Sequence, residues 1–391
     1  MGGNRYHAVG AGVSPDVGSA GWNRLGNDRD PPGGPAGCET RPISSRRNHT
    51  ARRNAMTPPL HAPERGVALV VVLWVLLVLS LLIGGFAFTM HVETQVASYS
   101  RKALKAESLA RSGIEMARVE LLEHSKKPAE AQFEALNQLW AANKERYVNH
   151  ALGEGTFNVT VVDEESRLPI NQLDEEQLHR LLHLLDAELL DADVVVDSIL
   201  DWIDGDDLHR LNGAETDYYK ALPTPYRAKN GPLHRVEELL LIRGVTPELF
   251  HGLPATDRRA ARPGLKDLFT TDSSGRININ TAPAIVLQTA FNLDEPRVAA
   301  VLERRNGSDG ILGTEDDHPF RTVDEFFREF GPVDPAEQKA WQRWASVRST
   351  RFRVTATGEV GGVRRTITAI LARTVNDYEV LAWMPAPGGQ P

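Results

Sequence analysis

The feature that most constrains this chain is an uninterrupted apolar run, VALVVVLWVLLVLSLLIGGFAF, at residues 67–88. The run has no charged side chain, and a helix of its length, rising about 1.5 Å per residue, crosses a hydrocarbon core of about 30 Å. Arg65 precedes the run, and the next basic side chain beyond it, after His91, is Arg101. Because basic residues favour the cytoplasmic side, we predict a single transmembrane helix with a cytoplasmic N-terminus and a periplasmic C-terminal head.

The segment before the apolar run indicates how the N-terminus is processed. A secretory signal is cut after its apolar stretch, whereas here a small residue suited to cleavage, Gly66 followed by Val67, stands before it. Cleavage between these two residues would leave the apolar helix in the mature protein. Residues 1–55 are rich in Gly, Pro, Arg and Asn and lack apolar periodicity, so we predict a non-native or disordered extension there and a leader at residues 56–66.

The patterns after the apolar run predict an α+β fold. Apolar residues recur at helical spacing over residues 90–124, which extends the first helix as an amphipathic one. β-Branched residues mark strands at residues 156–162, 351–357 and 363–371, and a Gly-Gly turn at residues 361–362 joins the last two as a hairpin. A long, mostly helical stretch separates the first strand from this hairpin. We therefore predict a long helix packed on a small antiparallel sheet, with a helical domain inserted into the sheet.

The same patterns set the domain boundaries beyond the transmembrane helix. Each boundary falls where one kind of periodicity gives way to another. The predicted parts are an amphipathic helix with the first strand at residues 89–166, the inserted helical domain at 167–349, the C-terminal β-hairpin at 350–375 and a tail at 376–391.

The inserted domain shows signs of duplication. Residues 167–171 (RLPIN) match residues 276–280 (RININ), and residues 232–239 resemble residues 319–326. Repeated sequence at a constant offset indicates repeated structure. We predict two related SAM-like or helix-hairpin-helix-like repeats, at about 167–255 and 276–345.

Two acidic loops are candidate calcium sites. Ca²⁺ takes about six to eight oxygen ligands, and carboxylates crowded around a turn repel one another without a cation. The spacing in the first loop does not fit the EF-hand pattern, and the second loop resembles the calcium-binding turns of bacterial surface repeats. Each loop could instead be a solvated acidic turn. The first loop contributes Asp201, Asp204, Asp206, Asp207, Glu215 and Asp217, and the second contributes Asp309, Glu315, Asp316 and Asp317.

Charge and motifs disfavour two other classes of function. The formal net charge is −8, so a phosphate-binding surface is disfavoured even though residues 240–247 have the shape of a hairpin found in DNA-binding modules. No nucleophile elbow or phosphate loop is present, so we predict no catalytic residues and no enzymatic activity.

The processing site and the plan of helix followed by sheet resemble the type IV pilin and type II secretion pseudopilin superfamily. Most members carry Glu at the fifth mature position, where this chain has Val71. The lack of this Glu is typical of the minor pseudopilin K family, also called general secretion pathway protein K. The segments that resemble this family are residues 66–75, 199–204, 212–219, 230–233 and 276–283.

The resemblance implies a pilin-like fold and a structural role. It implies a subunit at the tip of the type II secretion pseudopilus that helps to initiate the pseudopilus and to export folded proteins across the outer membrane. The implied partners are the minor pseudopilins I and J, the major pseudopilin G, the prepilin peptidase and the inner-membrane secretion platform. The resemblance also implies N-terminal methylation at Val67, an inner-membrane location and a calcium-binding head. Two alternatives remain open: a K-like minor pilin of a type IV pilus system, and a membrane-tethered periplasmic hydrolase.

Overall fold

The computed structural model describes residues 65–128, 130–185, 192–255, 261–311, 314–332 and 334–385. The chain divides into two compact units, Met1–Val72 and Leu73–Pro391, and the described part of the first unit is only the start of one helix. The extension predicted at residues 1–55 lies outside the described residues, as does the predicted leader up to residue 64. Both stay predictions.

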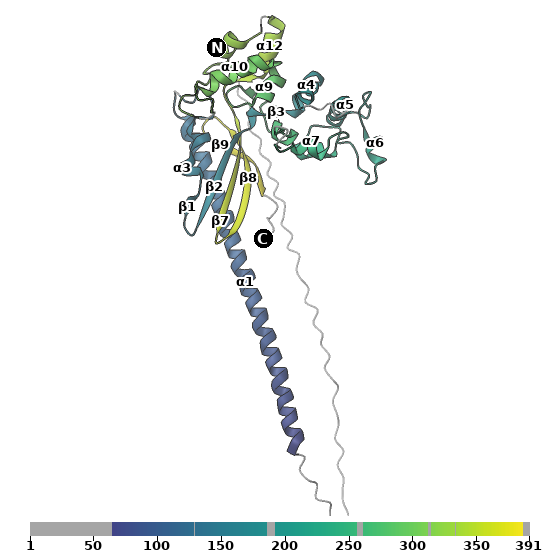
Figure 1. Cartoon of the computed structure of the whole chain (residues 1–391), viewed down its shortest axis with the longest axis vertical. Helices are drawn as coiled ribbons and strands as arrows, with labels where there is room; N and C mark the ends of the chain where they lie inside the picture. The colour runs from purple at the N-terminus through teal and green to yellow at the C-terminus, as the bar shows by residue number, and fades with distance from the viewer. Residues whose placement is uncertain are drawn as a thin grey trace, which may run out of the picture. The chain divides into compact units, whose positions relative to one another are not determined.

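Helix α1, Arg65–Ser125, joins the predicted transmembrane helix and its amphipathic continuation into one continuous helix (Figure 1). Nearly every side chain of residues 67–88 is exposed. Among the described residues, α1 is the one helix long and apolar enough to cross a membrane. Its N-terminal half is therefore compatible with a single-pass membrane anchor.

The C-terminal half of α1 packs against the sheet. Strand β7, Arg351–Val360, approaches α1 so closely that a Cβ at Gly358 would lie 2.0 Å from the backbone oxygen of Ala106. Only glycine permits this contact between helix and strand backbones. The buried face of α1 consists of small and apolar side chains three or four residues apart: Ala106, Ala110, Ile114, Ala117 and Leu121.

Five antiparallel strands form the sheet in the order β1-β2-β7-β8-β9. The predicted strands correspond to β2, β7 and β8, and Gly361 and Gly362 between β7 and β8 have φ values of +53° and +82°, which suit the predicted tight turn. β2 pairs directly with β7, so the helical domain is inserted between two neighbouring strands, as predicted. The other bounds are β1 His150–Leu152, β2 Gly155–Asp163, β8 Val363–Arg373 and β9 Tyr378–Pro385.

The two outer strands, β1 and β9, were not predicted. The prediction of a tail at residues 376–391 is wrong for residues 378–385, because β9 pairs with β8 and extends the sheet. Tyr378 anchors β9 in the core, where its ring centroid lies 5.9 Å from that of Phe352. Residues 386–391 lie outside the described residues. Before β1, two short helices, α2 Leu139–Ala142 and α3 Lys144–Tyr147, were also not predicted.

The inserted domain consists of short helices around one shared apolar core. Two small parallel strand pairs, β3 Leu168–Pro169 with β4 Phe269–Thr270 and β5 Ile277–Asn278 with β6 Ala345–Ser346, connect segments that are distant in sequence. The helical elements are η1 Glu164–Ser166, η2 Ile170–Gln172, α4 Glu175–Leu184, α5 Ala192–Ile203, α6 Thr216–Lys220, η4 Val236–Leu241, α7 Pro247–His251, α8 Leu265–Leu268, α9 Ala284–Phe291, α10 Glu295–Asn306, α11 Val323–Phe330 and α12 Pro335–Trp344.

The two segments matched in sequence occupy matching structures. The Asn171 side chain accepts a hydrogen bond from Leu233 N at 2.7 Å and donates one to Leu233 O at 2.9 Å. The Asn280 side chain makes the same pair of bonds with Phe320, at 2.8 Å and 2.9 Å. The duplication of the insert stays a prediction, and these two asparagine clamps support it.

Candidate metal site

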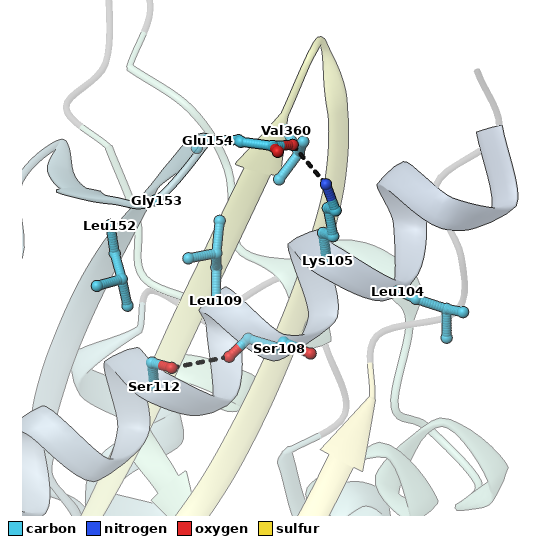
Figure 2. Close-up of a pocket in the computed structure, with 10 residues that line it drawn as sticks. Leu104, Lys105, Ser108, Leu109, Ser112, Leu152, Gly153, Glu154 and Val360 are labelled. Carbon is cyan, nitrogen blue, oxygen red and sulfur yellow. Dashed lines mark hydrogen bonds and ion pairs between the residues drawn. The ribbon is translucent and has the colours of Figure 1, made fainter. Parts of the chain in front are cut away.

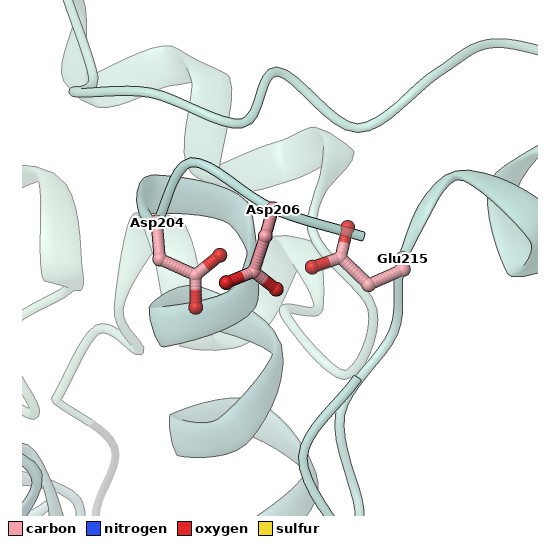
Figure 3. A group of neighbouring side chains, drawn as sticks. All are labelled: Asp204, Asp206 and Glu215. Atoms are coloured by element: carbon pink, nitrogen blue, oxygen red, sulfur yellow. The ribbon is translucent and has the colours of Figure 1, made fainter. Parts of the chain in front are cut away.

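The first acidic loop follows α5 and brings together three of its six predicted carboxylates. Asp204, Asp206 and Glu215 each direct a carboxylate toward the others (Figure 3), and one oxygen from each lies within 4.8 Å of the other two. The end of α5 supplies Asp204, the following turn supplies Asp206, and the residue before α6 supplies Glu215. Hard oxygen ligands gathered in this way suit a divalent cation such as Ca²⁺.

Hydrogen bonding within the cluster tests whether these residues fit a cation. Glu215 is 1% exposed, and neither of its carboxylate oxygens has a hydrogen-bond partner among the described residues. Asp204 Oδ1 is likewise buried without a partner. Burial, together with Asp201 and Asp204 nearby, raises the pKa of Glu215 to about 7. Buried carboxylates without donors are costly, and a cation would satisfy all of them together, so the residues fit Ca²⁺.

Asp201 lies beneath the cluster and positions the loop. Its fully buried carboxylate accepts hydrogen bonds from Arg210 N at 3.2 Å and 3.1 Å. A Cβ at Gly213 would lie 1.9 Å from Asp201 Oδ2, so glycine is required where the loop passes over this carboxylate. Asp201 therefore holds the loop in shape and is not one of the three gathered carboxylates.

The remaining two predicted residues of this loop also lie outside the three-carboxylate cluster. Asp207 accepts a hydrogen bond from Asn230 Nδ2 at 3.0 Å, which contributes to a pKa below its usual range. Asp217 is exposed and accepts one from Tyr218 N at 2.8 Å.

Sequence reasoning missed two residues that brace this loop. Asn230 Nδ2 also donates to Asp206 O at 2.6 Å, while its side-chain oxygen is buried without a partner among the described residues. Arg243 Nη1 donates to Gly213 O at 3.0 Å, and its guanidinium lies 4.8 Å from the ring centroid of Tyr218. The Asn230-Gly231 pair was the one available signal, since Asn tolerates the positive φ of +47° seen there. No spacing rule could indicate Arg243.

The second acidic loop has a different arrangement. Asp316 Oδ2 accepts hydrogen bonds from Ser308 N at 2.8 Å, Ser308 Oγ at 2.9 Å and Asp309 N at 3.1 Å, and Asp316 Oδ1 accepts one from Thr314 Oγ1 at 2.8 Å. These donors, led by Thr314, hold the pKa of Asp316 well below its usual range.

The other carboxylates of this second loop differ in their surroundings. Asp309 accepts from Ile311 N at 2.7 Å, and Glu315 is exposed. Thr314 Oγ1 lies 3.2 Å from Asp317 Oδ1 as well as 2.8 Å from Asp316 Oδ1, so its single proton serves one of the two at a time. No cluster of three carboxylates forms in the described part of this loop, which has a gap at residues 312–313. Calcium binding there stays a prediction.

An apolar groove lies beside α1, away from both acidic loops. It has a volume of about 480 Å³, and Leu104 and Leu109 of α1 line it together with Leu152 and Val360 (Figure 2). An ion pair between Lys105 and Glu154 closes one side. Leu104 is 66% exposed, so the groove is an apolar surface open to a partner.

Comparison with known proteins identifies relatives over most of the chain. The family described as type II secretion system protein K matches residues 155–255. The protein K of Pectobacterium carotovorum subsp. carotovorum is 36% identical over 101 residues, covering 25% of this chain and 31% of that relative. The protein K of Klebsiella pneumoniae is 25% identical over 342 residues, covering 81% of this chain and 95% of that relative.

A solved structure shares the fold. The crystal structure of the GspK-GspI-GspJ complex from the type 2 secretion system of enterotoxigenic Escherichia coli contains a chain that matches with a TM-score of 0.59 at 22% identity. The match covers 76% of this chain and 100% of that one. The fold of about three quarters of this chain thus occurs in a known protein. Over most of its length the chain is therefore similar to type II secretion system protein K, the family of minor pseudopilins that the sequence resembles.

Proposed function

We propose that this minor pseudopilin is the tip subunit of the type II secretion pseudopilus, where it helps to initiate assembly and to export folded proteins across the outer membrane. The observation that carries the proposal is the two-part use of α1, whose apolar half is exposed while its other half packs on the sheet.

The positions of the strand ends also support the proposed tip role. Gly361, at one end of the β7–β8 hairpin, lies near Lys102 of α1, whereas the inserted domain leaves and rejoins the sheet at the opposite strand ends, Asp163 and Arg351. The insert is thereby attached at the strand ends opposite the β7–β8 turn.

The membrane topology and processing form a second part of the proposal. The prepilin peptidase cuts between Gly66 and Val67, the new amino terminus is methylated, and α1 anchors the chain in the inner membrane with the head in the periplasm. Gly66, a small residue directly before the charge-free run, supports this cut site. Intact mass of the mature protein tests it: we expect a chain that begins at Val67 and carries a methyl group. An amino terminus beyond Phe88, or normal processing of Gly66→Trp, would overturn it.

Assembly with the minor pseudopilins I and J is the third part, with the major pseudopilin G and the inner-membrane platform as further partners. The solved relative is a complex of its K, I and J proteins, and the apolar groove at Leu104 offers a surface for such a contact. We expect Leu104→Glu to reduce co-purification of I and J with the full chain. Leu241→Glu is the matched control, because Leu241 is 46% exposed but lies in the insert. Equal co-purification of both variants with wild type would remove the groove from the interface.

Calcium binding at Asp204, Asp206 and Glu215 is the fourth part. The unpartnered oxygens of Glu215 and Asp204 support it. Tb³⁺ replaces Ca²⁺ at oxygen sites, and Trp202 in α5 lies next to the loop as an energy donor. We expect terbium luminescence excited through tryptophan, displaced by Ca²⁺ and lost in Glu215→Gln. Asp217→Asn should retain the signal, since Asp217 lies outside the cluster. Equal signals from both variants would overturn the site.

The protein K family that the chain resembles is structural and is not a known enzyme family, which supports the prediction of no enzymatic activity. No observation on the described residues favours the hydrolase alternative. The type IV pilus alternative would require a partner set other than I and J, so the co-purification experiment also tests it.

A further inference from the structure

Four buried carboxylates gather where the inserted domain joins the sheet. Asp163 ends β2, Glu164 and Glu165 follow it in η1, and Glu134 lies in the segment before α2. Asp163 is 2% exposed, and the other three are fully buried. Water therefore stabilises none of these groups, and each charge depends on partners inside the protein.

The four carboxylates differ in their partners. Glu164 forms an ion pair with Arg353 of β7, and Glu134 forms one with Arg373 of β8. Asp163 and Glu165 make no ion pair with any described residue. Two buried carboxylates, two residues apart and without a cation of their own, repel each other, so holding both charges at once is costly.

Neutral donors from distant segments hold Asp163. Its Oδ2 accepts hydrogen bonds from Thr281 Oγ1 at 2.6 Å, Ser349 Oγ at 2.6 Å and Asn278 Nδ2 at 3.1 Å. Ser349 lies where the chain returns from the insert to the sheet, whereas Asp163 lies where it leaves. This carboxylate therefore ties together both crossings between the two parts.

Glu165 makes the matching tie one residue further along the returning chain. It accepts hydrogen bonds from Thr350 Oγ1 at 2.6 Å and from Thr350 N at 3.0 Å. The hydroxyls of Thr350, Ser349 and Thr281 can act as acceptors as well as donors. A proton on either carboxyl would therefore keep a hydrogen-bond partner.

Other titratable and charged groups face the cluster from every element packed around it. Most of these groups are arginines, and His124 is the one histidine among those in the described residues. These groups are His124 of α1, Arg167, Asp272, Arg351 and Arg353 near Glu164, and Arg373 with Tyr378 near Glu134.

We propose that Asp163 and Glu165 form a proton-binding latch, in which proton uptake by the pair tightens the attachment of the inserted domain to the sheet in mildly acidic solution. The latch goes beyond the proposed function, because no role in assembly or metal binding requires it. Burial, and then Glu165, raises the pKa of Asp163 to about 7, and burial raises the pKa of Glu165. Each folded-state pKa lies above its unfolded value. The folded state therefore binds the proton more tightly, and this stabilisation is lost as the pH rises through about 7.

His124 works in the opposite direction. Burial lowers its pKa, so the folded state disfavours its proton, and this contribution to stability increases as the pH rises through the range of an ordinary histidine. A latch that outweighs His124 gives a net loss of stability at alkaline pH.

Thermal unfolding of the full chain in detergent micelles with EDTA tests the latch. We expect the wild-type melting temperature to fall between about pH 5.5 and about pH 8.5. Glu165→Gln mimics the protonated carboxyl and can keep both contacts with Thr350, so it should melt higher than wild type at about pH 8.5 and lose part of the pH dependence, since metal-free Glu215 contributes another part. Glu123→Gln is the matched control, because Glu123 is exposed on α1 and should leave the pH dependence unchanged. A Glu165→Gln variant with the pH dependence of wild type would overturn the latch.

Infrared spectroscopy tests the same latch in the wild-type protein and so does not depend on a variant that folds. A protonated buried carboxyl gives a C=O stretching band separate from that of ionised carboxylates. We expect this band in wild type at about pH 6 and its loss at about pH 9, and we expect the band to persist in Glu215→Gln, since the raised pKa of Glu215 would otherwise account for it. Absence of the band at about pH 6 would also overturn the latch.

Discussion

The two predicted repeats of the inserted domain share an asparagine clamp but differ in how their acidic loops are satisfied. In the first repeat, both oxygens of Glu215 are buried without a hydrogen-bond partner among the described residues. In the second repeat, Asp316 accepts four hydrogen bonds from nearby N–H and hydroxyl groups. The number of carboxylates therefore does not distinguish a cluster that could bind a cation from a turn whose carboxylates are hydrogen-bonded within the loop. The local supply of donors makes that distinction.

The clamps show the converse case, in which the same contacts lie in different surroundings. Asn171 is half-buried, whereas Asn280 is 1% exposed. The hydrogen-bond distances agree within 0.1 Å. Equal geometry with unequal burial predicts unequal energies, because water can replace a lost partner only where it has access.

The largest expected effect concerns these clamps. Asn280→Ala leaves the N–H and C=O of Phe320 buried without partners and should cost about 3 kcal/mol, whereas Asn171→Ala should cost about 1 kcal/mol because water reaches the vacated site. Chemical denaturation of the full chain in micelles measures both. Asn137→Ala, at a half-buried asparagine with no side-chain hydrogen bond among the described contacts, should change stability by less than about 0.5 kcal/mol. Equal losses of stability in Asn280→Ala and Asn171→Ala would contradict the expected effect of burial.

The next effect separates the two acidic loops. Ca²⁺ at about one hundred times its dissociation constant should stabilise the wild-type chain by about 2.7 kcal/mol over the EDTA-treated chain. Glu215→Gln should abolish most of this shift, and Asp316→Asn should preserve it. Calorimetry with and without EDTA measures all three proteins. A shift that survives in Glu215→Gln and vanishes in Asp316→Asn would reverse the assignment of the two loops.

A third effect follows from competition between Ca²⁺ and a proton at Glu215. The pKa of this group is raised to about 7 in the metal-free protein, so cation binding must displace a proton below that pH. The affinity for Tb³⁺ should fall with pH, approaching tenfold, or about 1.4 kcal/mol, for each unit below about 7, and should level off above it. Without metal, the stability of the folded state changes with pH in the opposite direction to the Tb³⁺ affinity. The raised pKa stabilises the folded state at lower pH, and this contribution is lost as the pH rises through about 7. An affinity independent of pH would remove Glu215 from the ligand set.

The smallest effect concerns Asp316, whose pKa is held below its usual range. A lowered pKa stabilises the folded state above the unfolded-state pKa of the carboxyl, and the contribution is lost as the pH falls through the folded-state value. Asp316→Asn should therefore remove this small contribution at neutral pH and flatten acid unfolding below about pH 4. Acid titration followed by tryptophan fluorescence measures it. A large loss at neutral pH would show that the second loop is braced as firmly as the first.

Much of the fold was predictable because its signals are local. Periodicity placed the apolar run, its amphipathic continuation, and strands β2, β7 and β8 within a few residues of their observed bounds. The edge strands β1 and β9 were missed because a short edge strand gains its stability from one neighbour and from anchors such as Tyr378, whose burial depends on Phe352.

The candidate site was predicted only in part. Composition located all six acidic residues of the first loop, but the structure gathers Asp204, Asp206 and Glu215 and sets Asp201 apart as a buried support. Asn230 and Arg243 join the loop through contacts across the fold, which sequence spacing does not encode.

The sequence by itself determined that this chain has a charge-free helix and a helical domain inserted between two strands, and it predicted a processing site before the helix. These features follow from local composition and periodicity, which require no knowledge of the fold. Only the tertiary structure decided which carboxylates meet, which are satisfied by donors and which are buried without a cation. Those properties depend on the water that each side chain loses on folding and on the partners that it gains. Segments distant in sequence supply most of those partners.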